Sequence, residues 1–475
     1  MRTTIGLLIA SALSAQTADP SLTPHPYTTF VASTVAQDVA LTPKGGWTFI
    51  VGSTTDPLYP VTGDAFDRTC GTDGTCNRFQ GRFGIERVAD VVLTVFDASG
   101  QIRYSTFVGG PGRDDNPRIA LSRDGTIWLA ANSTAGAFEH VQPGCIGNLL
   151  LLRFEYTLRR VEELQCLSGP TLADLVLDSD GTVWVLGTIS TQVPTVNAFQ
   201  PTIAGQVDMF VAHVASQQSA PLMSTYIGGD RLDLATALAV TPGGDVAIVG
   251  STNSTNFPLV RPLRTVSPTT ITFGDAAVLV LDRTGRFLEF STYWGGAFDD
   301  SAQGVATDAA GNLYVAGTAA SADFPVTAGA FDAVCDGPAN PAGCRDAFVT
   351  RFTATGAVTA STLFGGTVVD TAFGVAVQQD GEVVLLGLTQ SPDIPLVGGQ
   401  PFQRWRAGVN FAHSFLAVFD PQLTRVTRSV FVGSEQFLPS VPRFTIGGGF
   451  AYVTGQVTMT TGPAFGTFLG AVPLP

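Results

Sequence analysis

An aspartate recurs four times in the sequence, each time four residues after the second glycine of a Gly-Gly pair. The four positions are Asp114, Asp233, Asp300 and Asp370. A ring of such carboxylates could bind Ca²⁺ or a polyol, because these ligands prefer oxygen atoms. The alternative is structural, since an aspartate in a turn accepts hydrogen bonds from nearby backbone N–H groups. We favour the structural role and keep ligand binding as the alternative hypothesis.

Few other residues suggest chemistry. Trp294 and Trp405 could stack on sugar rings, and packing is the alternative for both. The acid pairs Asp114-Asp115 and Asp299-Asp300 could support glycoside hydrolysis only at the right separation. None of the four histidines lies in a metal-binding motif, and no nucleophile elbow or phosphate-binding loop occurs. We therefore predict no catalytic residue, no metal ligand and no cofactor, with Ca²⁺ as the one ion to test.

A repeated turn marks the strands that must position these residues. A turn glycine follows an apolar stretch seven times, and the residue six positions later is always small. The turn glycines are Gly46, Gly125, Gly181, Gly244, Gly311, Gly381 and Gly449, and the small residues are Gly52, Ala131, Gly187, Gly250, Gly317, Gly387 and Gly455. We expect the turn glycine to adopt a positive φ and the small residue to allow close packing.

Each of the seven units has the same internal order. An apolar strand such as 374–379 leads through the glycine turn into a second strand such as 382–388. After a long connection comes a third strand (for example 346–352), and then a fourth that ends in the pattern STxxGG. Seven units of four antiparallel strands predict an all-β fold, a seven-bladed β-propeller.

The stretch YTTFVAS at residues 27–33 resembles the fourth strand of a unit, although it stands at the beginning. The last unit has a second strand at 450–457 and a third at 465–472, and then the chain stops. We therefore predict that residues 27–33 pair with 465–472, complete the last blade and close the ring.

The repeat resembles the SBBP family, the "β-propeller repeat" of secreted bacterial proteins. The best-matching unit contains FSTYWGG at 290–296, GNLYVAGTAASADFP at 311–325 and DAFVTRF at 346–352. The unit near 164 departs most, with LQCLSGP where STYxGG is expected. The resemblance implies a seven-bladed propeller and no particular activity, because fold does not settle function.

In such blades the connections after strands two and four share one face, opposite the tight turns. The six cysteines belong mainly to the connections after strand two, and their proximity in sequence predicts three disulfides: Cys70–Cys76, Cys145–Cys166 and Cys335–Cys344. Stapled, variable loops on a rigid scaffold form a plausible binding surface.

Composition limits the class of protein. The chain has 475 residues, of which 45% are hydrophobic and 13% charged, with 53 glycines and 29 prolines, as in a well-buried, turn-rich globular protein. The net charge is −14, which disfavours binding to nucleic acid. No apolar run is long enough to span a membrane.

The N-terminus has the layout of a secretory signal peptide, with Arg2 followed by a short apolar run and small residues. We predict three segments: a signal peptide at 1–15 with an approximate cleavage point, a short extension at 16–26 and one propeller domain at 27–475. The location is then secreted, periplasmic or on the cell surface, and we expect a monomer.

These observations favour an exported, non-catalytic binding or scaffold module that uses its long-loop face for a protein or carbohydrate partner. The alternative is an extracellular hydrolase or lyase that acts on polysaccharide with acids at the channel mouth.

Overall fold

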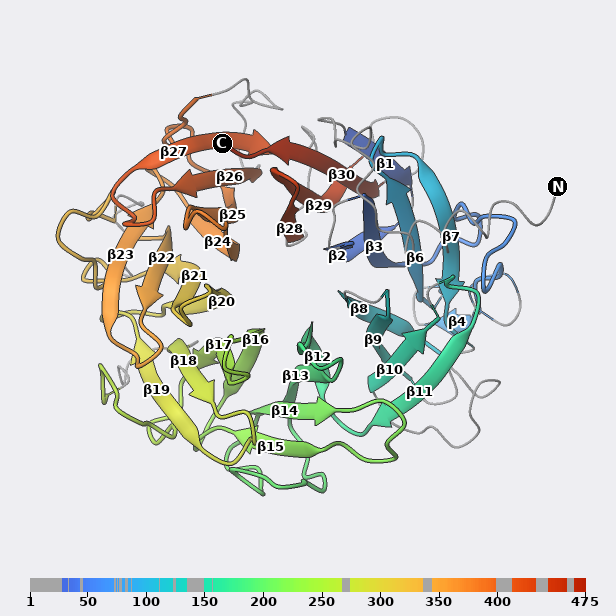
Figure 1. Ribbon diagram of the computed structural model, residues 1–475, viewed down its shortest axis with the longest axis horizontal. Coiled ribbons are helices and arrows are strands. Elements are labelled where there is room, and N and C mark those ends of the chain that lie inside the picture. Colours follow the sequence, from blue (N-terminus) through green and yellow to red (C-terminus); the bar gives the residue numbers. More distant parts are fainter. Residues whose placement is uncertain are drawn as a thin grey trace. The chain divides into compact units, whose positions relative to one another are not determined.

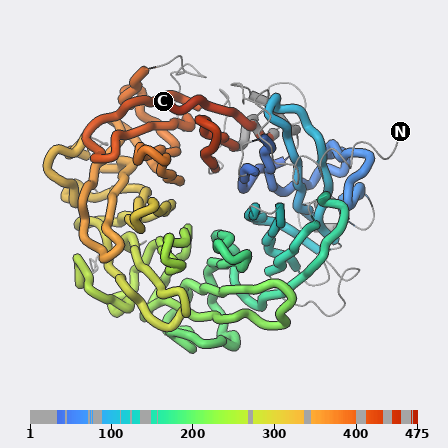
Figure 2. The backbone as a smooth tube through the Cα atoms, in the orientation of Figure 1, coloured from blue at the N-terminus to red at the C-terminus, as the bar shows by residue number. Residues whose placement is uncertain are grey.

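The structure is a computed structural model of the whole chain (Figures 1 and 2). It describes residues 28–32, 34–42, 46–71, 74, 76, 79–81, 84–86, 88–110, 112–122, 125–134, 149–155, 157–266, 274–335, 344–398, 412–432, 443–458 and 465–475. Within these residues, all regular elements are β-strands. The chain divides into two compact units. Unit 1 comprises Met1–Leu172 with Gln436–Leu474, and unit 2 is essentially Ala173–Glu435.

Unit 1 contains three four-stranded antiparallel sheets and a small two-stranded one. Blade 1 consists of β2 (Val35–Leu41), β3 (Trp47–Thr54), β6 (Asp90–Asp97) and β7 (Ile102–Val108). Blade 2 consists of β8 (Asp114–Leu121), β9 (Ile127–Ser133), β10 (Leu149–Phe154) and β11 (Val161–Leu167). Blade 7 consists of β28 (Arg443–Gly447), β29 (Phe450–Thr458), β30 (Phe465–Pro473) and β1 (Thr28–Ala32). The small sheet pairs β4 (Phe79–Gly81) with β5 (Gly84–Glu86).

Unit 2 contains four sheets of the same kind. Blade 3 consists of β12 (Thr171–Leu177), β13 (Val183–Ile189), β14 (Asp208–Val214) and β15 (Met223–Ile227). Blade 4 consists of β16 (Asp233–Val240), β17 (Val246–Thr252), β18 (Asp275–Leu281) and β19 (Leu288–Trp294). Blade 5 consists of β20 (Ser301–Thr307), β21 (Leu313–Ala319), β22 (Asp346–Phe352) and β23 (Val358–Phe364). Blade 6 consists of β24 (Asp370–Val377), β25 (Val383–Thr389), β26 (His413–Phe419) and β27 (Val426–Val432).

Seven four-stranded antiparallel sheets are the blades of a seven-bladed β-propeller, as the sequence predicted. Six of the seven turn glycines have the expected positive φ; they are Gly125, Gly181, Gly244, Gly311, Gly381 and Gly449. The exception is Gly46, whose φ is not positive.

The small residue six positions after the turn glycine lies where strands one and two of a blade approach closely. A Cβ atom added to Gly52, Gly250, Gly317 or Gly387 would collide with a carbonyl oxygen of the first strand. Strand one carries a β-bulge here, as between Ala235 and Ala237 in β16. The irregularity in β8 is longer, from Asp115 to Arg118, and an alanine, Ala131, occupies the position in that blade. Close packing therefore sets the requirement for a small residue.

The hydrophobic core lies between neighbouring sheets of a unit. In unit 2 one buried cluster joins Trp184 and Met209 of blade 3 to Ile248 and Leu279 of blade 4. Both faces of the second and third strands are covered in this way, which explains why these strands are apolar at nearly every position.

Strand β1 pairs with β30 and is the outermost strand of blade 7 (Figure 1). The register is antiparallel, with Phe30 opposite Phe468. The predicted pairing of residues 27–33 with 465–472 is confirmed for Thr28–Ala32, while closure of the ring stays a prediction.

Candidate functional site

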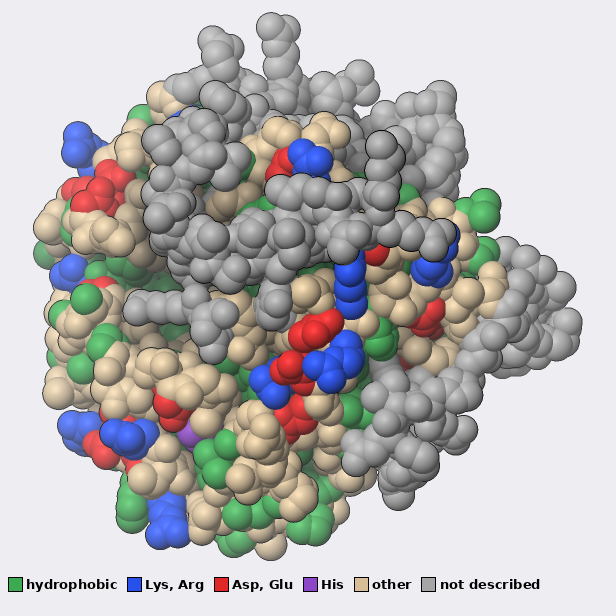
Figure 3. All heavy atoms as spheres, turned by 45° about the vertical axis from the view of Figure 1, so that its right-hand side comes forward, with side chains coloured by type: hydrophobic (Ala, Val, Ile, Leu, Met, Phe, Trp, Pro, Cys, Tyr) green, Lys and Arg blue, Asp and Glu red, His purple; other side chains and the backbone are tan. Residues whose placement is uncertain are grey.

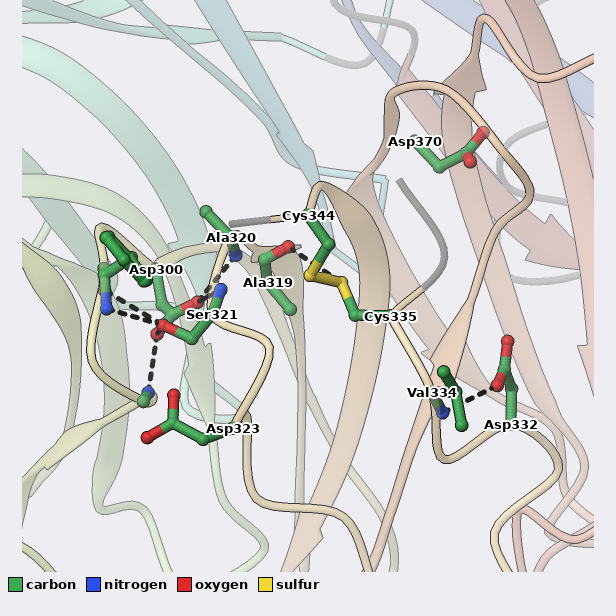
Figure 4. Close-up of a disulfide and its surroundings, with 12 residues drawn as sticks. Asp300, Ala319, Ala320, Ser321, Asp323, Asp332, Val334, Cys335, Cys344 and Asp370 are labelled. Atoms are coloured by element: carbon green, nitrogen blue, oxygen red, sulfur yellow. Dashed lines mark hydrogen bonds between the residues drawn. A yellow bond between two sulfur atoms is a disulfide. The ribbon is translucent and has the colours of Figure 1, made fainter. Parts of the chain in front are cut away.

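Asp300 is fully buried at the start of blade 5 and is surrounded by hydrogen-bond donors (Figure 4). Oδ2 accepts the N–H of Gly296 at 2.6 Å and the hydroxyl of Ser321 at 2.7 Å. Oδ1 accepts the N–H groups of Ala320 at 2.7 Å and Ser321 at 3.2 Å. The carboxylate thus ties the junction between β19 and β20 to the end of β21. We call this arrangement of aspartate, glycine N–H and serine the junction lock.

The same lock recurs in the neighbouring blades of unit 2. Asp233 accepts the N–H of Gly229 at 2.8 Å, and Asp370 accepts that of Gly366 at 2.8 Å. The serine is also repeated, because Ser254 and Ser391 donate to these carboxylates at 2.9 and 2.7 Å. In unit 1, Asp114 accepts the N–H of Gly110 at 3.1 Å.

All four repeated aspartates are fully buried and accept bonds within their own junctions. These are the bonds that the structural alternative predicts. The pattern also explains the serines Ser254 and Ser391, because the hydroxyl of each completes a lock.

A second buried aspartate, which the sequence analysis did not single out, accompanies each of the four locks. It is the first residue of the third strand in four blades: Asp90, Asp208, Asp275 and Asp346. In three junctions a Cβ atom on the first glycine would approach both acids. At Gly228 it would lie 2.5 Å from Cγ of Asp208 and 2.8 Å from Oδ2 of Asp233. Two buried carboxylates therefore flank the first glycine, which explains why no side chain is possible there. The signal was present in the sequence as the recurring Asp of the DAF pattern.

The second aspartate obtains its partners from the long connection of its own blade, and these partners differ between blades. Asp90 accepts the N–H of Gly71 at 2.5 Å. Asp208 accepts the side-chain amide of Gln200 at 2.9 Å and two backbone N–H groups. Asp275 forms an ion pair with Arg264, 3.2 Å from Oδ2 to Nη1.

Burial makes these acids hard to ionise. It raises the pKa of Asp114 to about 8, with a contribution from the neighbouring carboxylate of Asp90. Burial likewise raises the pKa of Asp275 to about 8, with Arg264 opposing the shift and Asp300 adding to it. Burial raises the pKa of Asp233 to about 6, and several hydrogen bonds that stabilise its charged form oppose this shift. The pKa values of Asp300 and Asp370 are raised for the same reason.

The two tryptophans proposed for sugar stacking have different outcomes. Trp294 is only 6% exposed and donates from Nε1 to the hydroxyl of Thr350 at 3.2 Å. Its ring packs edge-on against Phe324 and Phe352. It thus occupies the core, which was the alternative for this residue. Trp405 lies outside the described residues.

Two of the three predicted disulfides, Cys70–Cys76 and Cys335–Cys344, are present in the structure. Figure 4 shows the second one in the connection of blade 5. Cys145 lies outside the described residues, so the pair Cys145–Cys166 stays a prediction. The first disulfide brackets Gly71, whose N–H reaches Asp90, and thus holds the partner of a buried acid.

The long connections between the second and third strands run along the outer edge of the fourth strand. The sequence did not predict this path. In blade 4, Val260 and Ser291 exchange backbone hydrogen bonds of 3.1 and 2.9 Å. The hydroxyl of Thr292 accepts the N–H of Leu263 at 3.0 Å. The Ser-Thr of the STxxGG pattern therefore holds the connection against its own blade. A connection held in this way is called a strap below.

The described surface of unit 1 mixes charges of both signs. Arg153 pairs with Glu162 at 3.0 Å, and Arg159 pairs with Asp64 at 3.0 Å. Figure 3 shows acidic and basic side chains next to one another on this side. A continuous basic surface for a phosphate backbone is absent from the described part of this view.

The described residues contain neither a metal-binding group nor a membrane-spanning helix. No three or more His, Cys, Asp and Glu side chains are grouped so as to hold a metal ion there. The same residues include no helix with the length and apolarity needed to cross a membrane.

The fold and its junctions define a β-propeller protein built from a repeated blade-to-blade lock. Residues 289–325 match the family model "Beta-propeller repeat" (SBBP), which confirms the resemblance noted from the sequence. This match covers β20, β21, all of β19 except Leu288, and the lock of Asp300.

No curated protein matches the chain significantly. Among solved structures, the chain is similar to hydrazine synthase from Kuenenia stuttgartiensis, with 11% identity, a TM-score of 0.48 and coverage of 89% of this chain and 92% of the other. It is also similar to the polysaccharide lyase Uly1, with 9% identity, a TM-score of 0.45 and coverage of 93% and 90%. Likeness at this level carries no argument about activity.

Proposed function

We propose that this protein is an exported, non-catalytic binding or scaffold module that contacts a protein partner through the connections and junctions of unit 2. The observation that carries the proposal is a difference in burial between the acidic and the apolar side chains of these segments. Their repeated acids are buried and bonded internally, whereas several of their large apolar side chains are exposed.

Six exposed large apolar side chains belong to the described parts of these segments. They are Leu263, Val266, Phe298, Val334, Leu396 and Val397. Val266 and Val334 are the most exposed, at 64% and 62%. Apolar groups of this kind gain free energy by contact with another protein surface. A sugar site would instead need polar groups arranged beside an aromatic ring, so a protein is the better partner.

Substitutions on the connection of blade 4 test the proposal. The triple variant Leu263→Ser, Val266→Ser and Phe298→Ser should lose most of the binding found in screens against cell-envelope proteins and glycans. The matched control is Leu222→Ser with Phe287→Ser, which changes exposed apolar residues at the tight turns. A partner bound equally by all three proteins would contradict the proposed surface.

The enzyme alternative is tested in the same preparations by measuring release of reducing ends and unsaturated products from polysaccharides. Turnover that Asp300→Asn abolishes without lowering the melting temperature would overturn the non-catalytic proposal.

A further inference from the structure

Five blades cover the outer edge of their fourth strand with their own strap. In each of these fourth strands, the backbone of a serine forms a hydrogen bond with the backbone of the strap. The strap-to-strand bonds are Thr62 to Ser105 (3.0 Å), Val196 with Ser224 (2.8 Å), Val260 with Ser291 (2.9 Å), Thr327 to Ser361 (3.0 Å) and Val397 with Ser429 (2.8 Å). An unpaired edge is a template for another strand, so these straps protect five edges.

Blade 7 repeats the attachment residues, and none of its described residues forms a strap. Its fourth strand is β1, and Thr28-Thr29 of YTTF matches Ser105-Thr106 of YSTF. The connection from Thr458 to Phe465 comprises only residues 459–464. Fully extended, six residues span about 20 Å. A strap would have to cross β30 and β1, at about 4.8 Å per strand, run along the outer edge and return. The connection is too short for this path.

The backbone register identifies the groups that face outward. In blade 1, Ser105 lies opposite Thr94, and its carbonyl points away from that strand to accept the N–H of Thr62. Thr28 occupies the equivalent place opposite Gly470 of β30. Its N–H and C=O therefore point to the outer edge. Among the described strands, β30 is the only one paired with β1.

We propose that the outer edge of β1 binds an extended segment of a protein partner by strand addition, in the place that a strap takes in five other blades. The segment is neutral or basic, because the chain carries a net charge of −14. The same charge repels a second copy. The residues that precede β1 include Pro20, Pro24 and Pro26, which have no N–H to donate to the edge.

A strap of the protein itself supplies the probe. The synthetic peptide NFPLVRPLR corresponds to residues 256–264, in which Val260 bonds to Ser291, and it carries two arginines. The labelled peptide is titrated with the full chain at low salt, and fluorescence anisotropy reports binding. We expect saturable binding that Thr28→Pro weakens at least about tenfold, since proline removes the outward N–H. A melting temperature within a few degrees of wild type shows that this variant folds.

A modified peptide and a variant of unit 2 test whether binding depends on the edge of β1. A peptide N-methylated at Val260 should bind at least about tenfold more weakly, because its donor is blocked. The unit 2 variant with Leu263→Ser, Val266→Ser and Phe298→Ser should bind the peptide normally, so that this proposal and the proposed function fail separately. Equal binding to wild type and to Thr28→Pro would overturn it. Slow hydrogen exchange at the Thr28 amide of the free monomer would also overturn the proposal, because the edge would already be covered. A dimer that Thr28→Pro dissociates would overturn it as well, because the occupant would then be a second copy of the chain.

Discussion

The junction that leads into β16 and the one that leads into β20 have the same lock and different surroundings. Both hold a buried aspartate, Asp233 or Asp300, with a glycine N–H and a serine hydroxyl. The second acid differs: Asp208 accepts from the neutral amide of Gln200 and from two backbone N–H groups, whereas Asp275 pairs with the cation of Arg264.

The comparison separates what each blade must keep from what it can vary. The lock draws its donors from the junction and from the end of the second strand, which every regular blade contains. The second acid draws its partner from the long connection, whose length and sequence differ between blades. Arg264 also donates to the carbonyl oxygens of Gly295 and Gly296, at 2.8 and 2.6 Å, so a single side chain replaces several neutral contacts.

The largest effect is expected from removing the lock itself. Asp300→Ala would leave the N–H groups of Gly296 and Ala320 and the Ser321 donors without their buried acceptor. We expect the free energy of unfolding to fall by about 3–5 kcal/mol, measured by chemical denaturation. Asp233→Ala should behave in the same way. The control Asp299→Ala changes the adjacent, less buried acid and should lose less than about 1 kcal/mol. Equal losses for Asp299→Ala and Asp300→Ala would refute the lock.

The next largest loss of stability is expected from removing the partners of the second acids, Asp275 and Asp208. At pH 9, where Asp275 is ionised, Arg264→Leu leaves the buried carboxylate without its ion pair, and we expect a loss of about 2–3 kcal/mol. Gln200→Leu should cost about 1 kcal/mol, because Asp208 keeps its two backbone donors. Thermal and denaturant unfolding of both variants measures the difference. The comparison fails if Gln200→Leu is the more damaging substitution.

A smaller effect is expected in the dependence of stability on pH. The raised pKa values mean that the folded state binds protons that the unfolded state releases above about pH 4. Their contribution to stability is therefore complete at low pH and is lost as pH rises, up to about 6 for Asp233 and about 8 for Asp275. Asp275→Asn should remove at least about 1 kcal/mol of the decline between pH 6 and 8. Asp233→Asn should leave that part unchanged. Melting temperatures across pH 4–9 provide the test, and parallel curves for wild type and Asp275→Asn would contradict it.

The smallest effect concerns the exposed caps of the two junctions. Asn256 accepts the N–H of Asp230 at 2.7 Å, and Asp323 accepts that of Ala297 at 2.8 Å. An amide oxygen can replace a carboxylate oxygen there, so Asp323→Asn should change stability by less than about 0.5 kcal/mol. Asp323→Ala should cost more, because it leaves the N–H of Ala297 unpaired. A large loss for Asp323→Asn would show that the charge itself matters at this junction.

Much of the fold was predictable because its signals are local and periodic. The turn glycines and small residues such as Gly250 mark where two strands of one hairpin meet, and a hairpin is determined by neighbours in sequence. The displaced strand Thr28–Ala32 was recognised for the same reason, since its pattern repeats that of other fourth strands.

The site was predictable only in part. Recurrence identified Asp233 and Asp300, whereas the second acids Asp208 and Asp275 recur just as regularly and were seen only as part of a strand motif. Trp294 was proposed as a stacking residue because a sequence does not show which face of a ring is covered.

By itself, the sequence determined the seven repeated units, the order of four strands in each, and the places where a glycine or the first aspartate recurs. These features follow from backbone geometry and hydrogen bonding within a few tens of residues. Only the tertiary structure decided which carboxylates are buried, that Arg264 neutralises Asp275, and that long connections run along the outer strands. Such contacts join residues far apart in the chain, and they depend on packing that no local pattern records.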